Sequence, residues 1–200
     1  MNTKNPSVPP GNSQPSAPKR EAARRLAAIP AAPLAFIPTA PAVVPPLFRR
    51  VDYLSFGVTT LIVFLGYFWT LAPDLGLQDS GELATASMYA GIPHPPGYPI
   101  WTIYTWLFTL LPFSNIAFRV ALSSAIAAAF SCGIVALMVS RGSSMLMEGI
   151  ATLKCIQETN RRLENAICVV SGFVAGMLIG FNGFMWSQAV MVEVYTLSVL

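Results

Sequence analysis

Charged side chains are scarce in this sequence of 200 residues. Only 10% of the residues are Asp, Glu, Lys or Arg, whereas 54% are hydrophobic, and the mean hydropathy is +0.58. Soluble domains carry about 25% charged residues, so the composition argues against a soluble protein and is typical of an integral membrane protein. The net charge of +3 is too small to indicate nucleic-acid binding, and we expect no nucleic-acid partner.

Cysteine, histidine and short catalytic motifs are also rare or missing. The three cysteines lack C-x-x-C spacing, so we interpret Cys132, Cys155 and Cys168 as small hydrophobic residues rather than a disulfide framework. The sequence has no P-loop, H-E-x-x-H, G-x-S-x-G or dinucleotide-binding motif. Its only histidine is spaced too loosely from nearby acids to support a divalent metal, and we predict no metal or other cofactor.

Proline divides the chain into an arm and a membrane domain. Eleven of the seventeen prolines lie in residues 1–48, where they block helices and central strands, so we predict a disordered arm. For residues 49–200 we predict an all-α integral membrane protein, a multispanning helical bundle. The predicted spans lie at about 53–72, 117–139 and 166–185, with the start of a fourth near 193–200. Because that fourth span is incomplete, we expect the chain to be a truncated piece.

The basic residues predict how the bundle is oriented. With an external loop at 73–116 and a cytoplasmic link at 141–165, eleven of the twelve Lys and Arg residues lie inside, and only Arg119 lies outside. Basic residues are enriched in cytoplasmic connections, so the count predicts a cytoplasmic N-terminus.

A polar, turn-rich stretch at residues 75–99 follows the first apolar run and holds the clearest candidates for chemistry. Asp79 and Glu82 are three residues apart, so on a helix they share one face and could act as a base and its charge partner. The same D-S-G-E spacing also fits a capping box, in which both acids serve only to start a short helix over 81–90. These two roles are compatible.

Three other residues on the predicted external side have alternative interpretations. His94, in P-H-P-P-G-Y-P, could bind a phosphate, join a metal site or hydrogen-bond its own loop. Arg119 and Glu193 lie at the outer ends of their spans, where they could form an ion pair between helices or bind an anionic substrate.

Four blocks of the sequence resemble a known family, and the resemblance covers about residues 53–200. The blocks are L-Q-D-S-G-E-L at 77–83, H-P-P-G-Y-P at 94–99, L-L-P followed by F-R-V-A-L-S-S-A at 110–125, and W-S-Q-A-V-M-V-E-V-Y-T-L at 186–197. They are similar to the N-terminal part of a bacterial membrane-protein family of unknown function. That family is related to the transmembrane protein O-mannosyltransferases of glycosyltransferase superfamily C.

This resemblance implies an inverting glycosyltransferase of the bacterial inner membrane. It would move a sugar, for example mannose, from a polyprenyl-phosphate carrier to a hydroxyl of a protein or glycan acceptor on the outer face. By the same resemblance the catalytic acid maps onto Asp79, with Glu82 beside it. The H-P-P-G-Y-P block carries over as His94, Pro95, Pro96, Gly97 and Tyr98, and the last block as Gln188, Glu193 and Tyr195. A departing phosphate also needs a cation, for which Arg119 and His94 are the external candidates, so the predicted substrate-binding residues are His94, Tyr98, Arg119, Gln188, Glu193 and Tyr195. Because members of the superfamily have many more spans, the 200-residue chain alone is expected to be inactive.

Two other classes of function remain open from the residues. A transporter or flippase component would need ionisable groups near the membrane midplane, and the three predicted spans contain none. A non-catalytic membrane subunit would use the external loop only to dock a partner.

Overall fold

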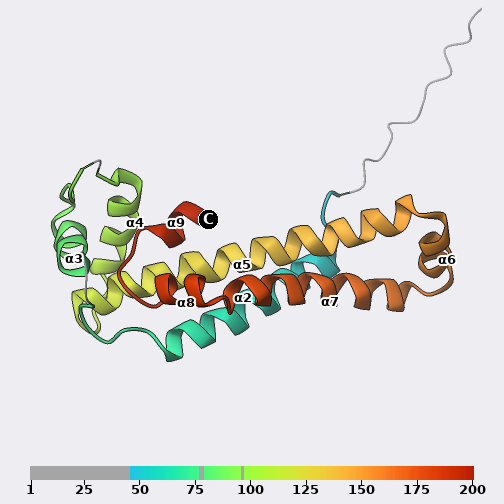
Figure 1. Cartoon of the computed structure of the whole chain (residues 1–200), viewed down its shortest axis with the longest axis horizontal. Helices are drawn as coiled ribbons and strands as arrows, with labels where there is room; N and C mark the ends of the chain where they lie inside the picture. Colours follow the sequence, from blue (N-terminus) through green and yellow to red (C-terminus); the bar gives the residue numbers. More distant parts are fainter. Residues whose placement is uncertain (1–45, 77–78, 96) are drawn as a thin grey trace, which may run out of the picture. The chain divides into compact units, whose positions relative to one another are not determined.

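The protein is all-helical in every part that the structure describes. We analysed a computed structural model, which describes residues 46–76, 79–95 and 97–200 (Figure 1). Residues 1–45 of the predicted disordered arm lie outside the described residues. The helices are α2 (Arg50–Trp69), α3 (Ser80–Tyr89), α4 (Pro99–Thr109), α5 (Ile116–Gly149), α6 (Ala151–Thr159), α7 (Arg161–Gly180), α8 (Gly183–Ala189) and α9 (Tyr195–Val199).

Three of these helices, α2, α5 and α7, are long and apolar enough to cross a membrane. They confirm the predicted helical membrane fold, although their bounds differ from the predicted spans. Helix α2 starts three residues before the predicted span, and α7 starts five residues early and ends at Gly180. The chain then breaks at Phe181–Asn182, where the Asn182 side chain accepts a hydrogen bond from the Phe184 amide and starts α8.

Helix α5 is longer than the second predicted span and forms the centre of the bundle. It runs ten residues past position 139, so much of the predicted link at 141–165 is helical. In its most apolar window 61% of the residues are buried, against 28% for α2 and for α7. The other two helices therefore expose apolar side chains such as Leu61 and Leu178, as expected for helices that face lipid.

Glycines on α7 let the three long helices approach closely. A Cβ atom added to Gly176 would lie 2.5 Å from the Thr59 side chain of α2 and 2.8 Å from the Cys132 carbonyl of α5. One turn later, a Cβ atom at Gly180 would lie 2.9 Å from Val63. Small residues at four-residue spacing allow this contact, which drives helix association where lipid supplies no hydrophobic force.

Helices α3 and α4 pack together beside the N-terminal end of α5 (Figure 1). The hydroxyls of Ser87 in α3 and Thr105 in α4 are hydrogen bonded at 2.8 Å. Tyr104 of α4 donates to the Ser123 carbonyl of α5 at 2.9 Å, and burial raises the pKa of Tyr104 to about 12, so it remains a donor. Helix α4 has eleven residues, too few to span a bilayer, and it falls within the stretch 73–116 that the sequence predicted as a loop.

Candidate active site

Asp79 and Glu82 lie at the start of α3, but they do not form a capping box. Asp79 occupies the position before the first helical residue, and its side chain makes no capping hydrogen bond. Glu82 turns instead toward the loop that follows the helix: one carboxylate oxygen accepts from the His94 amide at 2.6 Å, and the other lies 3.2 Å from His94 Nδ1. Asp79 is exposed, so its carboxylate is accessible to a ligand.

The loop that carries His94 is a tight turn. The Gly97 amide donates to the His94 carbonyl at 2.9 Å. Gly97 has φ +74, and a Cβ atom there would lie 3.0 Å from Ile92, so only glycine fits without strain. The imidazole of His94 meets the ring of Tyr98 edge to face, with centroids 6.1 Å apart. The structure therefore groups Glu82, His94 and Tyr98, while Pro96 lies outside the described residues.

Arg119 does not form an ion pair with Glu193, which was one of the two interpretations of these residues. Its guanidinium instead donates to the backbone carbonyls of Thr109, Leu111 and Asn115, the Leu111 bond being 2.6 Å long. The first two carbonyls belong to the C-terminal end of α4 and the turn after it, where helical carbonyls lack partners and a positive charge is favourable. The Arg119 side chain thus ties the end of α4 to the start of α5.

Glu193 is the second acid near Asp79. It lies between α8 and α9 and is half-buried, whereas its neighbours Val192 and Val194 are buried. Burial raises the pKa of the Glu193 carboxyl; the Val194 amide, which donates to it at 3.3 Å, opposes this shift, and the charge of Asp79 adds to it. Asp79 is therefore close enough for its charge to act on Glu193, although more than a hundred residues separate them.

A pocket of about 320 Å³ lies between the loop and the last segment of the chain. Its lining includes Tyr98 and Trp101 on one side and Val194 and Ser198 on the other. Two of the blocks that carried the family resemblance therefore meet at one cavity.

Two other predicted site residues, Gln188 and Tyr195, are not bonded to the acids of the candidate site in the described part of the chain. The amide oxygen of Gln188 is buried without a hydrogen-bond partner there, and Tyr195 is 55% exposed. Nor do the described residues contain three or more His, Cys, Asp or Glu side chains arranged to hold a metal ion.

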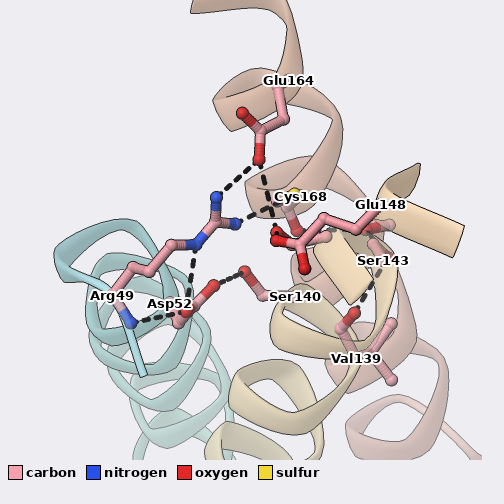
Figure 2. Close-up of polar contacts among 10 residues, drawn as sticks. Arg49, Asp52, Val139, Ser140, Ser143, Glu148, Glu164 and Cys168 are labelled. Atoms are coloured by element: carbon pink, nitrogen blue, oxygen red, sulfur yellow. Dashed lines mark hydrogen bonds and ion pairs between the residues drawn. The ribbon is translucent and has the colours of Figure 1, made fainter. Parts of the chain in front are cut away.

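A second polar cluster, at the other end of the long helices, was missed by the sequence analysis (Figure 2). Asp52 and Glu164 were assigned to connections, but both are fully buried. Arg49 bridges them: its side chain lies 2.6 Å from Glu164 Oε1 and 3.6 Å from Asp52 Oδ2. On α5, Ser140 donates to Asp52 at 2.6 Å and Ser144 donates to Glu164 at 3.3 Å. The only signal in the sequence was an acid close to basic residues at each helix start.

The described residues form a helical membrane protein. Asp79, Glu193 and the pocket beside Tyr98 lie on the segments outside its three long helices. The family model described as "Protein O-mannosyl-transferase TMEM260 N-terminal domain" matches residues 79–200, so the chain belongs to this family. The match starts at Asp79 and includes Glu193.

A named relative supports the same assignment. Over 130 residues the chain is 31% identical to mouse (Mus musculus) "Protein O-mannosyl-transferase TMEM260", a match covering 64% of this chain and 15% of the mouse protein. The chain thus corresponds to a small part of that relative. No solved structure matches the chain. The predicted relationship to protein O-mannosyltransferases is confirmed, while a bacterial origin stays a prediction.

Proposed function

We propose that this chain is part of a glycosyltransferase that transfers a sugar from a polyprenyl-phosphate carrier to an acceptor hydroxyl. The family assignment supports the reaction class, and the name of the mouse relative favours mannose as the sugar. The observation that carries the proposal is the proximity of Asp79 and Glu193, which lie near opposite ends of the matched region. The acceptor would be a protein or a glycan.

In this reaction Asp79 is the general base. An acceptor hydroxyl is a poor nucleophile, so a carboxylate must remove its proton as the glycosidic bond forms. Asp79 suits this role because it is exposed and makes no capping hydrogen bond. Glu193, whose pKa is raised by burial, holds a proton more readily and can donate a hydrogen bond to the sugar or the acceptor.

The leaving phosphate needs a positive partner. Arg119 is a poor candidate because its guanidinium already donates to three backbone carbonyls. His94 is half-exposed, and Glu82 holds both its backbone amide and its ring, so the imidazole is accessible and fixed in position. We propose that His94 contacts the phosphate and that Tyr98 lines the adjacent pocket.

The site is proposed to face the outer side of the membrane, with the N-terminus in the cytoplasm. The basic residues support this orientation, because only Arg119 lies on the outer side of the predicted topology. A bacterial inner membrane is the proposed location.

The test is transfer of labelled mannose from polyprenyl-phosphate mannose to membrane acceptors, using protein from the complete gene. Asp79→Asn should abolish transfer while leaving membrane insertion and thermal stability unchanged. Asp74→Asn is the matched control, because Asp74 is an exposed acid of the same segment whose carboxylate accepts from the neighbouring Leu75 amide. Normal transfer by Asp79→Asn would refute the base assignment.

The transporter alternative gains little support from the buried acids. Asp52 and Glu164 lie in the first turns of α2 and α7, at the ends of the helices rather than along a path through them. Absence of transfer by the unmodified protein, across several donor sugars, would favour a transporter or a non-catalytic subunit.

A further inference from the structure

The backbone carbonyl of Glu193 is held by side chains from two different helices. Trp101 of α4 donates its indole N–H to this oxygen at 3.1 Å, and Ser124 of α5 donates its hydroxyl at 3.2 Å. Both side chains are almost completely buried, with 4% and 2% exposed. A carbonyl oxygen has two lone pairs, so these two donors use its full capacity.

These two hydrogen bonds fix the segment that contains Glu193, which is neither helix nor strand. Residues 190–194 lie between α8 and α9 and have no regular hydrogen-bonding pattern. Buried Val192 and Val194 anchor the segment on either side of Glu193. The Glu193 carboxylate accepts a hydrogen bond from the Val194 amide at 3.3 Å and lies within reach of the charge of Asp79.

We propose that Trp101 and Ser124 are positioning residues that hold Glu193 opposite Asp79, so that the two acids act on one substrate. This inference rests on the proposed glycosyl transfer and adds to it the residues that set the geometry of the site. Each side chain acts on the Glu193 carboxylate through the backbone of Glu193, and Trp101 also lines the pocket beside Tyr98. The orientation of Glu193 is thereby coupled to α4 and α5, and Tyr104 fixes these two helices to each other.

The simpler explanation is that Trp101 and Ser124 only satisfy a buried carbonyl. Loss of a donor would then lower stability and leave the environment of the Glu193 carboxylate unchanged. The positioning role predicts in addition that the carboxylate moves away from Asp79 and into solvent. The two explanations therefore differ in how Glu193 titrates.

The experiment uses Trp101→Phe, Ser124→Ala and the double variant in protein from the complete gene. The first readout is modification of Glu193 by a water-soluble carbodiimide as a function of pH, followed by peptide mass spectrometry. Carbodiimides react with protonated carboxyls, and burial and the charge of Asp79 raise the pKa of Glu193. In the variants we expect the midpoint of modification to move to lower pH, most of all in the double variant.

The second readout is transfer of mannose from polyprenyl-phosphate mannose. We expect kcat to fall roughly tenfold or more in the double variant with little change in the KM of the donor, because misplacement of a catalytic group chiefly affects the chemical step. Ser124→Thr keeps the hydroxyl and should restore both readouts. The matched controls are Trp106→Phe, on the same helix as Trp101, and Ser131→Ala, whose hydroxyl bonds only within α5.

The two readouts separate the two proposals. An unchanged modification midpoint in the double variant would overturn the positioning role, whether or not the enzyme is active. A shifted midpoint in a protein that transfers no sugar would support the positioning of Glu193 and overturn the proposed reaction. Equal effects in the control variants would show that the shift reflects general loosening, and would also overturn the positioning role.

Discussion

At the scale of single residues, the acids of this protein occupy two contrasting environments. Asp79 is exposed and Glu193 half-buried, on the segments outside the long helices, whereas Asp52 and Glu164 are buried and bridged by a guanidinium. A buried carboxylate is tolerated where a positive partner and hydrogen bonds replace water. The first pair is therefore suited to chemistry and the second to structure.

The raised pKa of Glu193 predicts how stability depends on pH. A carboxyl that binds its proton more tightly in the folded state favours folding at low pH, and this contribution is lost as the pH rises through its folded pKa. We therefore expect Glu193→Gln to gain stability relative to the unmodified protein as the pH rises, because glutamine carries no charge. Thermal unfolding in detergent across a pH series measures this difference.

Asp79→Asn provides the control for this prediction. It removes the neighbouring negative charge that raises the pKa of Glu193, so the gain from Glu193→Gln should be smaller in that background. Parallel stability curves for the Glu193→Gln and unmodified proteins would contradict the expected pH dependence.

Arg49 should matter far more for stability than the adjacent Arg50. Arg49→Met removes the ion pair of the fully buried Glu164, and breaking a buried pair costs on the order of 3–5 kcal/mol. Arg50 is exposed, and Arg50→Met should change the free energy of unfolding by about 0.5 kcal/mol or less. Unfolding of both variants in detergent tests the contrast, and equal losses would show that the buried ion pair contributes little.

At the scale of helices, hydropathy predicted the three long helices. The helix ends were less predictable. The first span was predicted to start at about 53, just after Asp52, whereas Asp52 lies within α2, where Arg49 and Ser140 compensate its charge. Contacts between positions so far apart in the sequence are set by how the helices pack, and no local pattern reveals them.

The candidate site shows the same division between local and distant information. The position of Asp79 before α3 follows from the local sequence. Glu82 bonds His94 rather than capping its own helix, and this choice depends on the path of the loop. Arg119 binds the end of α4, and this contact depends on the turn between α4 and α5. The roles of these residues stay predictions, and of the two interpretations of Arg119 the ion pair with Glu193 is not formed, because its guanidinium donates to backbone carbonyls.

Gly176 should tolerate no side chain, whereas Gly57 should accept one. A Cβ atom at Gly176 would lie 2.5 Å from Thr59 and 2.8 Å from a backbone oxygen, so Gly176→Ala should separate α7 from its neighbours and cost about 1–3 kcal/mol. Nothing lies within 4 Å of a Cβ atom at Gly57, so Gly57→Ala should be neutral or stabilising by up to about 1 kcal/mol. Denaturation in detergent measures both changes.

At the scale of the whole molecule, the proposed topology predicts which cysteines an impermeant thiol reagent can reach. Cys155 is exposed on α6, while Cys132 and Cys168 are buried. Cys155 should therefore react in inverted vesicles and not in intact cells. In a Cys155→Ser background, Phe113→Cys, in the exposed turn between α4 and α5, should show the opposite pattern. Labelling of both positions from one side would refute the topology.

The bridge from Arg49 to Glu164 also has a consequence for biosynthesis. The two residues are 115 positions apart, so a ribosome adding about 5–20 residues per second makes Glu164 on the order of ten seconds after Arg49. During that interval Asp52 is the acid closest to Arg49 along the nascent chain. We expect pulse-chase experiments to show faster degradation of chains that end before Asn160 than of chains that end after Gly180. The arrival of α7 would then be the step that protects the growing protein from quality-control proteases.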